Sequence, residues 1–151
     1  MSIEDKNMEK VIVSACLIGE NCKYNGKNNK NENIINFLKD KEVILVCPEV
    51  MGGLSTPRLK SEILANEKDL KVINESNEDV TDYFVKGAIK SLKKAIENDV
   101  KLAVLKEKSP SCGFRKIYNG NFDGTKVDGS GVFARMLMEN NIKILTEEDF
   151  E

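Results

Sequence analysis

The sequence predicts an α/β fold, with a Rossmann-like arrangement of three layers around a mostly parallel sheet. Short apolar runs that suit buried strands occur at residues 10–16, 43–46 and 102–105. Residues 77–98 repeat apolar side chains at helical spacing and lead directly into the third of these strands. Strand, helix and strand in that order imply a right-handed crossover between parallel strands. Because no low-complexity linker divides the 151 residues, we expect residues 1–151 to form a single domain.

The long helix predicted at residues 77–98 has the clearest pattern in the chain. We expect Ser76 or Asn77 to cap it, with Glu78 and Asp79 near the positive end of the helix dipole. One apolar stripe would face the sheet, formed by Val85, Ala88, Ile89, Leu92, Ala95 and Ile96.

Local patterns predict the remaining elements. Residues 31–39 suit a short amphipathic helix, and residues 70–73 a further short strand. Residues 117–129 contain an Asn-Gly and an Asp-Gly pair, which are turn signals, and we expect a hairpin or a long ordered loop there. We expect Ser130 to cap a helix that ends near Asn140, and residues 142–145 to form the last strand.

Composition excludes several classes of protein. The chain has no histidine, so it cannot contain a Ser-His-Asp triad, a Cys-His pair or a histidine-ligated zinc. With a net charge of -2, the protein has no overall positive field that would attract the phosphates of a nucleic acid. The N-terminal ten residues are polar, without a signal-peptide core, and no apolar run approaches the ~20 residues of a membrane helix. We therefore expect a soluble, cytoplasmic protein with no membrane partner.

Cysteines stand at or just past the ends of the three predicted strands. Cys16 ends the first, Cys47 follows the second, and Cys112 lies in the loop after the third. Neighbouring parallel strands would bring these sulfurs to one edge of the sheet, where α/β folds bind ligands. The spacing lacks a Cys-x-x-Cys pair, and Cys22 lies six residues after Cys16. Spacing alone leaves a three-cysteine metal site and inert buried thiols equally supported.

The loops around these cysteines favour the metal site. All three prolines of the chain lie in the loops around Cys47 and Cys112. Proline fixes the backbone, and glycine lets it approach a bulky group closely. These residues are Pro48, Gly52, Gly53, Pro57, Pro110 and Gly113.

Several motifs together resemble those of the iron-sulfur-dependent thiouracil desulfidases, a family formerly catalogued as a domain of unknown function. They span nearly the whole chain and are Ser14-Ala15-Cys16-Leu17, Cys22-Lys23-Tyr24-Asn25-Gly26, Cys47-Pro48-Glu49, Gly52-Gly53-Leu54, Pro57-Arg58, Ser109-Pro110-Ser111-Cys112-Gly113 and residues 129–134. The family commonly has Arg and Asp where Lys23 and Asn25 stand, which puts any charged role at those two positions in doubt.

The resemblance implies a desulfidase-like domain with a [4Fe-4S] cluster held by Cys16, Cys47 and Cys112, and one iron left open to sulfur. It also implies that Glu49 and Ser109 assist catalysis. Glu49 would activate water or carry its proton, and Ser109 would hold the substrate or relay a proton. The reaction would replace the C=S of 2-thiouracil, 4-thiouracil or a related nucleoside by C=O and release sulfide, without net redox change.

The same loops supply the residues that we expect to contact the substrate: Ser14, Gly52, Gly53, Pro57, Arg58 and Ser111. A small thiolated pyrimidine is the favoured substrate. A tRNA is the weaker expectation, because the chain is acidic overall and has few aromatic residues for stacking. The sequence does not indicate an oligomeric state.

Two other classes remain open. A zinc-dependent hydrolase could use the same three cysteines with Glu49, as base deaminases pair a cysteine-rich zinc site with a glutamate. A non-catalytic domain stabilised by a metal would use all four cysteines, including Cys22, and would leave no open position.

Overall fold

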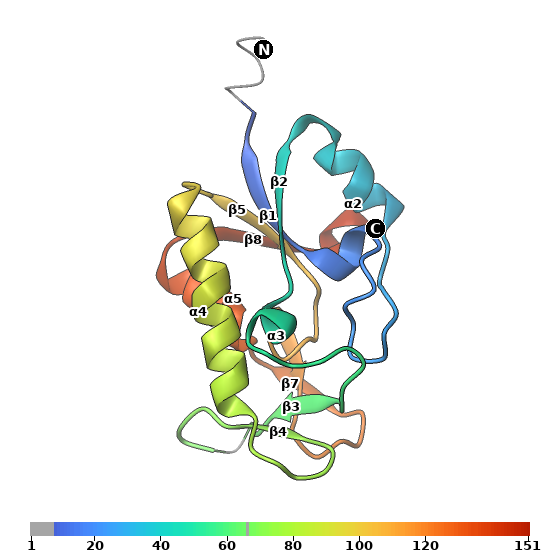
Figure 1. The fold of residues 1–151 in the computed structure, drawn as a ribbon, viewed down its shortest axis with the longest axis vertical. Helices are drawn as coiled ribbons and strands as arrows, with labels where there is room; N and C mark the ends of the chain where they lie inside the picture. The colour runs from blue at the N-terminus through green and yellow to red at the C-terminus, as the bar shows by residue number, and fades with distance from the viewer. Residues whose placement is uncertain (1–7, 66) are drawn as a thin grey trace.

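A four-stranded parallel sheet forms the centre of the computed structural model, which describes residues 8–65 and 67–151 (Figure 1). The N-terminal residues 1–7, part of the segment predicted to be polar, lie outside the described residues. The strands follow the order β2-β1-β5-β8. Their bounds are Lys10–Ser14 for β1, Glu42–Val46 for β2, Leu102–Leu105 for β5 and Lys143–Thr146 for β8.

Two antiparallel hairpins lie beyond one end of this sheet (Figure 1). One pairs β3 (Ser61–Ile63) with β4 (Val72–Asn74). The other pairs β6 (Lys116–Tyr118) with β7 (Lys126–Asp128), so the hairpin predicted at residues 117–129 is confirmed. The strand predicted at residues 70–73 corresponds to β4, which belongs to a hairpin and not to the central sheet.

Helices cover both faces of the sheet, as predicted for three layers. The α-helices are α2 (Glu32–Phe37), α3 (Pro48–Met51), α4 (Thr81–Glu97) and α5 (Val132–Glu139), and the 3-10 helices are η1 (Ala15–Ile18), η2 (Leu38–Asp40) and η3 (Glu147–Phe150). Alternate residues of β1 point to opposite faces. Ile12 packs with the buried side of α4 and α5, whereas Val11 and Val13 pack with η1 and α2.

The long helix α4 differs from its prediction at the N-terminus. It begins at Thr81, because Asn77 adopts a left-handed backbone with a φ of 63° and interrupts the helix. Neither Ser76 nor Asn77 caps it. The Asp79 carboxylate instead accepts hydrogen bonds from the Thr81 N–H at 2.9 Å and the Thr81 hydroxyl at 2.6 Å.

The predicted apolar stripe of α4 is wrong at two positions. Ile89 and Ile96 are 53% and 58% exposed. Gly87 and Ser91 are buried in their place, because the buried face includes the side on which α3 packs closely. Small residues such as Gly87 and Ser91 contribute little to an apolar pattern, so the pattern did not predict that they are buried.

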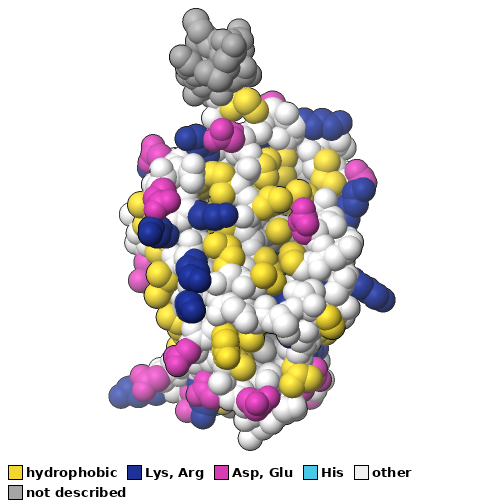
Figure 2. All heavy atoms as spheres, in the orientation of Figure 1, with side chains coloured by type: hydrophobic (Ala, Val, Ile, Leu, Met, Phe, Trp, Pro, Cys, Tyr) yellow, Lys and Arg dark blue, Asp and Glu magenta, His cyan; other side chains and the backbone are white. Residues whose placement is uncertain are grey.

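Figure 2 shows hydrophobic side chains among mixed charges on the face of the molecule seen in Figure 1.

Helix α5 also starts differently from its prediction. Gly131 occupies the capping position, and the Ser130 hydroxyl donates instead to the Phe114 carbonyl at 2.7 Å. The first free N–H groups of α5, at Val132 and Phe133, donate to the carbonyls of Pro110 and Ser111. The loop that carries Cys112 therefore caps this helix in place of a side chain.

Candidate active site

The three strands that precede the predicted cysteine ligands are neighbours in the sheet. Strand β1 pairs with β2 on one side and with β5 on the other, parallel in both cases. Their carboxyl ends therefore meet at one edge, where parallel α/β sheets place ligands. Cys47 directly follows β2, Cys16 lies in η1 immediately after β1, and Cys112 lies in the loop after β5.

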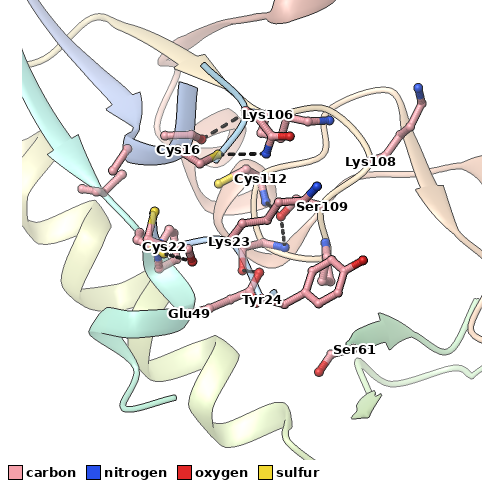
Figure 3. A pocket seen from close by; sticks show the side chains of 18 of the residues that line it. Cys16, Cys22, Lys23, Tyr24, Glu49, Ser61, Lys106, Lys108, Ser109 and Cys112 are labelled. Atoms are coloured by element: carbon pink, nitrogen blue, oxygen red, sulfur yellow. Dashed lines mark hydrogen bonds between the residues drawn. The ribbon is translucent and has the colours of Figure 1, made fainter. Parts of the chain in front are cut away.

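A cavity of about 250 Å³ lies at this edge, and all four cysteines line it (Figure 3). Glu49 from α3 and Ser109 from the loop after β5 line the same cavity. Cys112 is buried, and the other three cysteines are partly exposed and form no disulfide. The topology thus gathers thiols, a carboxylate and a hydroxyl from distant parts of the chain.

Polar groups lie near three of the sulfurs. The Asn29 side-chain amide donates to Cys16 Sγ at 3.3 Å. The Ser14 hydroxyl acts to lower the pKa of Cys112, and the Val50 N–H acts to lower the pKa of Cys47. Such donors stabilise thiolate over thiol, and they are among the groups that tune protein-bound iron-sulfur clusters.

The cysteines differ in acidity. Burial raises the pKa of Cys16 and of Cys112, because a low-polarity environment disfavours the thiolate. A hydrogen bond from Cys22 lowers the pKa of Cys47 to about 7, and the same bond raises the pKa of Cys22. In the protonated form, Cys47 can donate instead to the Cys22 carbonyl, at 3.7 Å. Burial therefore raises the free energy needed to ionise these thiols in the metal-free protein. A bound cationic centre would offset that free energy.

Glu49 is held by a hydrogen bond on each carboxylate oxygen. Arg58 Nε donates to Oε1 at 3.0 Å, and the Ser111 hydroxyl donates to Oε2 at 3.3 Å. Arg58 also donates to the Cys22 carbonyl at 2.9 Å. Its side chain is 7% exposed, and that of Glu49 is 16% exposed. Arg58 therefore ties the carboxylate to the segment that carries Cys22.

Ser109 shapes the loop that carries Cys112. Its Oγ accepts the backbone N–H groups of Ser111 and Cys112, each at 3.0 Å. A hydroxyl has two acceptor lone pairs and one donor. Both lone pairs are occupied, so the O–H of Ser109 is the part left for another group.

The structure brings some of the predicted substrate residues to the cavity and not others. Ser14, Arg58 and Ser111 line it. Gly52, Gly53 and Pro57 are not among its lining residues. A Cβ on Gly52 would lie 1.9 Å from the Tyr83 carbonyl oxygen, so this glycine serves the contact between α3 and α4.

Other residues of the cavity were not singled out from the sequence as site residues. They come from the loop after η1 and from the two hairpins, whose positions no local pattern predicts, and they are Lys23, Tyr24, Asn29, Lys60, Ser61 and Tyr118. Figure 3 shows Tyr24 and Ser61 on the side of the cavity where Glu49 lies. For Asn29, only its position in the polar loop after Cys16 was available as a signal.

The donor set fits an iron-sulfur cluster better than a single metal ion. Within residues 8–65 and 67–151, no three Cys, Asp or Glu side chains are grouped closely enough to hold one ion. Thiolates are the usual ligands of iron-sulfur clusters, which carry several irons and can join ligands spaced more widely. Lys106 and Arg58 line the same cavity and would balance part of the negative charge.

Fold and site together define an α/β protein with a thiol-lined cavity at the carboxyl edge of a parallel sheet. The chain belongs to the 2-thiouracil desulfurase family, whose model matches residues 11–149. The resemblance in the sequence motifs is thereby confirmed.

Two similar proteins support this membership. The uncharacterized protein YbbK of Bacillus subtilis (strain 168) is 39% identical over 145 residues, which cover 92% of this chain and 96% of that protein. The solved structure of the [4Fe-4S]-dependent thiouracil desulfidase TudS is 38% identical. It superposes with a TM-score of 0.85 over 93% of this chain and 92% of the other.

Among the helices that the structure describes, none has the length and apolar character needed to cross a membrane.

Proposed function

We propose that this protein is a desulfidase that converts the thiocarbonyl of a thiolated pyrimidine to a carbonyl, using a [4Fe-4S] cluster. The observation that carries the proposal is that thiols from three neighbouring strand ends share one cavity with Glu49. The similarity to TudS, which is [4Fe-4S]-dependent, supports the cofactor.

Cys16, Cys47 and Cys112 are the proposed cluster ligands. Cys22 also lines the cavity, but its carbonyl accepts from Arg58 at 2.9 Å and from the Cys47 thiol at 3.7 Å. We therefore place Cys22 as a neighbour of the ligands and not as a fourth ligand. When bound, a cluster with three protein ligands supplies a Lewis-acidic iron with an open position for the substrate sulfur.

Glu49 is the proposed proton carrier. Water must add to the C=S carbon and lose its protons, while the sulfur leaves as hydrogen sulfide, so that thiouracil and water give uracil and hydrogen sulfide. Each Glu49 oxygen receives one hydrogen bond from the protein, and a carboxylate oxygen can accept more than one. Glu49 can accordingly receive a proton from water while Arg58 and Ser111 hold its orientation.

Ser109 is the proposed substrate donor. Because its lone pairs accept two backbone N–H groups, its hydroxyl can donate to a pyrimidine oxygen or nitrogen but is poorly placed to act as a base. Of the two roles predicted for Ser109, we therefore propose that it holds the substrate in orientation by donating a hydrogen bond, and not that it relays a proton.

The proposed substrate is a free thiolated base or its nucleoside. The cavity of about 250 Å³ would have to hold the cluster as well as the substrate, and it already lies below the range of roughly 300–1,000 Å³ for sites that enclose drug-sized ligands. The space left beside the cluster suits a single base. The zinc-dependent hydrolase and the purely structural metal site receive less support, since the described side chains form no single-ion site.

Anaerobic reconstitution with iron and sulfide, followed by sulfide release from 2-thiouracil, 4-thiouracil and their nucleosides, tests this function. We expect a brown protein that releases sulfide from at least one of them. The single Cys→Ser variants of Cys16, Cys47 and Cys112 should lose iron, whereas Cys22→Ser should retain it. A colourless wild-type protein with one zinc per chain would refute the proposal in favour of the zinc enzyme.

A further inference from the structure

Glu107, at the base of the loop that carries Cys112, has a buried carboxylate that the proposed chemistry does not use. Glu107 follows β5 by two residues, and its side chain is fully buried. Burial of a charged group is costly unless its charge is matched by hydrogen bonds and a counter-charge. A carboxylate kept in such a position therefore needs a structural reason, and its partners show what that reason is.

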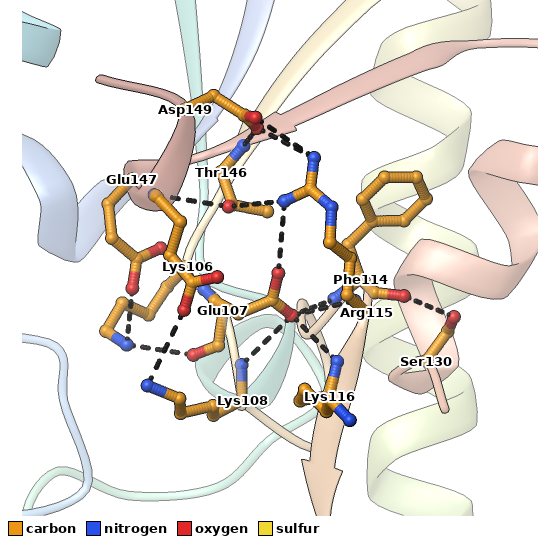
Figure 4. Close-up of polar contacts among 11 residues, drawn as sticks. Lys106, Glu107, Lys108, Phe114, Arg115, Lys116, Ser130, Thr146, Glu147 and Asp149 are labelled. Carbon is orange, nitrogen blue, oxygen red and sulfur yellow. Dashed lines mark hydrogen bonds and ion pairs between the residues drawn. The ribbon is translucent and has the colours of Figure 1, made fainter. Parts of the chain in front are cut away.

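Three consecutive backbone N–H groups converge on one oxygen of Glu107 (Figure 4). Glu107 Oε1 accepts from Phe114 at 2.6 Å, from Arg115 at 2.8 Å and from Lys116 at 3.2 Å, with a longer contact of 3.4 Å from Lys108. Successive N–H groups arranged in this way bind anions in many proteins. Here the anion is a side chain of the same loop.

The second oxygen of Glu107 faces a guanidinium group. Within the described residues, Oε2 has no hydrogen-bond partner, and Arg115 Nη1 lies 3.6 Å away, at the distance of an ion pair. Arg115 is itself fixed by Thr146 at 3.1 Å and by both oxygens of Asp149 at 3.0 and 3.1 Å. The Glu107 N–H donates to Glu147 at 2.7 Å. Glu107 is thus anchored to the end of β8 and to η3.

These contacts close the loop at its base. The chain leaves Glu107, passes through Ser109 and Cys112, and returns to the Glu107 carboxylate at residues 114–116. Lys108, at the start, has a φ of 71°, a left-handed backbone that a lysine adopts only when its surroundings impose it. The tip of the loop is held separately, by the N–H groups of Val132 and Phe133.

We propose that Glu107 is a positioning residue for the metal centre, which holds the loop so that Cys112 and Ser109 face the cavity. The part of this inference that concerns iron and turnover rests on the proposed function; the part that concerns the loop does not. Glu107 is among the residues that line the cavity. Its carboxylate is nevertheless held by the N–H groups of residues 114–116 and faces Arg115, so we infer that it acts through the backbone of the loop.

Glu62 provides a matched control in the same chain. It is 1% exposed, as Glu107 is. Its Oε1 accepts the N–H groups of Gly120 and Phe122 at 3.0 and 3.2 Å, and its Oε2 has no hydrogen-bond partner in the part of the chain that the structure describes. Glu62 fixes the hairpin of β6 and β7, and its side chain does not line the cavity. Loss of its charge should therefore reduce stability without releasing the metal.

The test compares Glu107→Gln with Glu62→Gln in the cluster-loaded protein, by iron release to a chelator and by hydrogen exchange. Loss of charged hydrogen bonds should speed exchange at residues 109–116 and iron release in Glu107→Gln by roughly tenfold to a hundredfold. In Glu62→Gln, exchange should rise near Gly120 and Phe122 only, and iron release should stay within about twofold of wild type. Glu107→Ala, if it folds, should show the larger effect.

Two results would overturn the proposal. One is iron release from Glu107→Gln at the wild-type rate, and the other is equally fast release from Glu62→Gln, which would reveal a general loss of stability. If the wild-type protein binds no iron, the proposed function fails. The hydrogen-exchange measurement then tests by itself whether Glu107 positions the loop. Unchanged exchange at residues 109–116 in Glu107→Gln would then reject the positioning role, and faster exchange would support it.

Discussion

The guanidinium of Arg58 donates from Nε to Glu49 Oε1 at 3.0 Å, and from Nη2 to the Cys22 carbonyl at 2.9 Å. A third nitrogen donates to Ser55 and Thr56. All three nitrogens are therefore bound within the protein, and Arg58 also lines the cavity, where it was predicted to contact the substrate. The planar guanidinium can bridge these groups at once, which a lysine ammonium on a flexible stem cannot do.

Arg58→Lys should lower kcat by roughly tenfold to a hundredfold, because Glu49 loses a charge-assisted hydrogen bond that fixes its orientation. Iron content and KM should change little. Steady-state kinetics of sulfide release measure both constants, and Arg135→Lys is the control, since Arg135 lies outside the cavity lining. A raised KM with wild-type kcat would show that Arg58 serves substrate binding, as predicted from the sequence, and not the orientation of Glu49.

Glu49→Gln should keep the iron and lose activity. Glutamine retains an oxygen for Arg58 but cannot carry a proton as a carboxylate does, and removal of a general base typically costs roughly 10²–10⁴-fold. Sulfide release and the visible spectrum should be measured together. Glu97→Gln, at an exposed ion pair on α4, is the control. Full turnover in Glu49→Gln would remove this residue from the mechanism.

Cys47 should be the most acid thiol of the metal-free protein. With a pKa of about 7, its thiolate fraction and its alkylation rate should rise as pH increases through 7 and level off above it. Cys22→Ala removes the hydrogen bond that lowers this pKa, so the midpoint of the alkylation-rate curve should move to higher pH. Cys22→Ser retains a donor and should move that midpoint less. Peptide mass spectrometry after timed alkylation identifies Cys47. A wild-type midpoint near 9 would contradict the prediction.

Gly87→Ala should displace α3 and with it Glu49. A Cβ on Gly87 would lie 1.7 Å from the Pro48 carbonyl oxygen and 2.9 Å from the Gly52 nitrogen. Overpacking of this kind costs about 1–3 kcal/mol, which corresponds to a fall in Tm of roughly 2–12 °C for a chain of this size. Lys90→Ala is the control, since Lys90 lies on the exposed side of the same helix. An unchanged Tm in Gly87→Ala would show that α3 can retreat without cost.

Several elements were predictable because their signals are local. The run at residues 102–105 coincides with β5, and the turn pairs between residues 117 and 129 gave the hairpin of β6 and β7. The start of α4 and the exposure of Ile89 were not predictable, since a left-handed residue at position 77 and a close contact with α3 decide them.

By itself, the sequence determined the layered α/β class, the absence of histidine chemistry, and the placement of Cys16, Cys47 and Cys112 at successive strand ends. These features depend on residue type and on spacing along the chain. Only the tertiary structure decided that β2, β1 and β5 are neighbours. It also decided that Arg58 hydrogen-bonds to Glu49, and that the Glu107 carboxylate accepts hydrogen bonds from the far end of the Cys112 loop. Strand order and hydrogen bonds between distant segments arise from packing, because the free energy of burying the sheet between helices is shared by the whole chain and is not encoded at any one position.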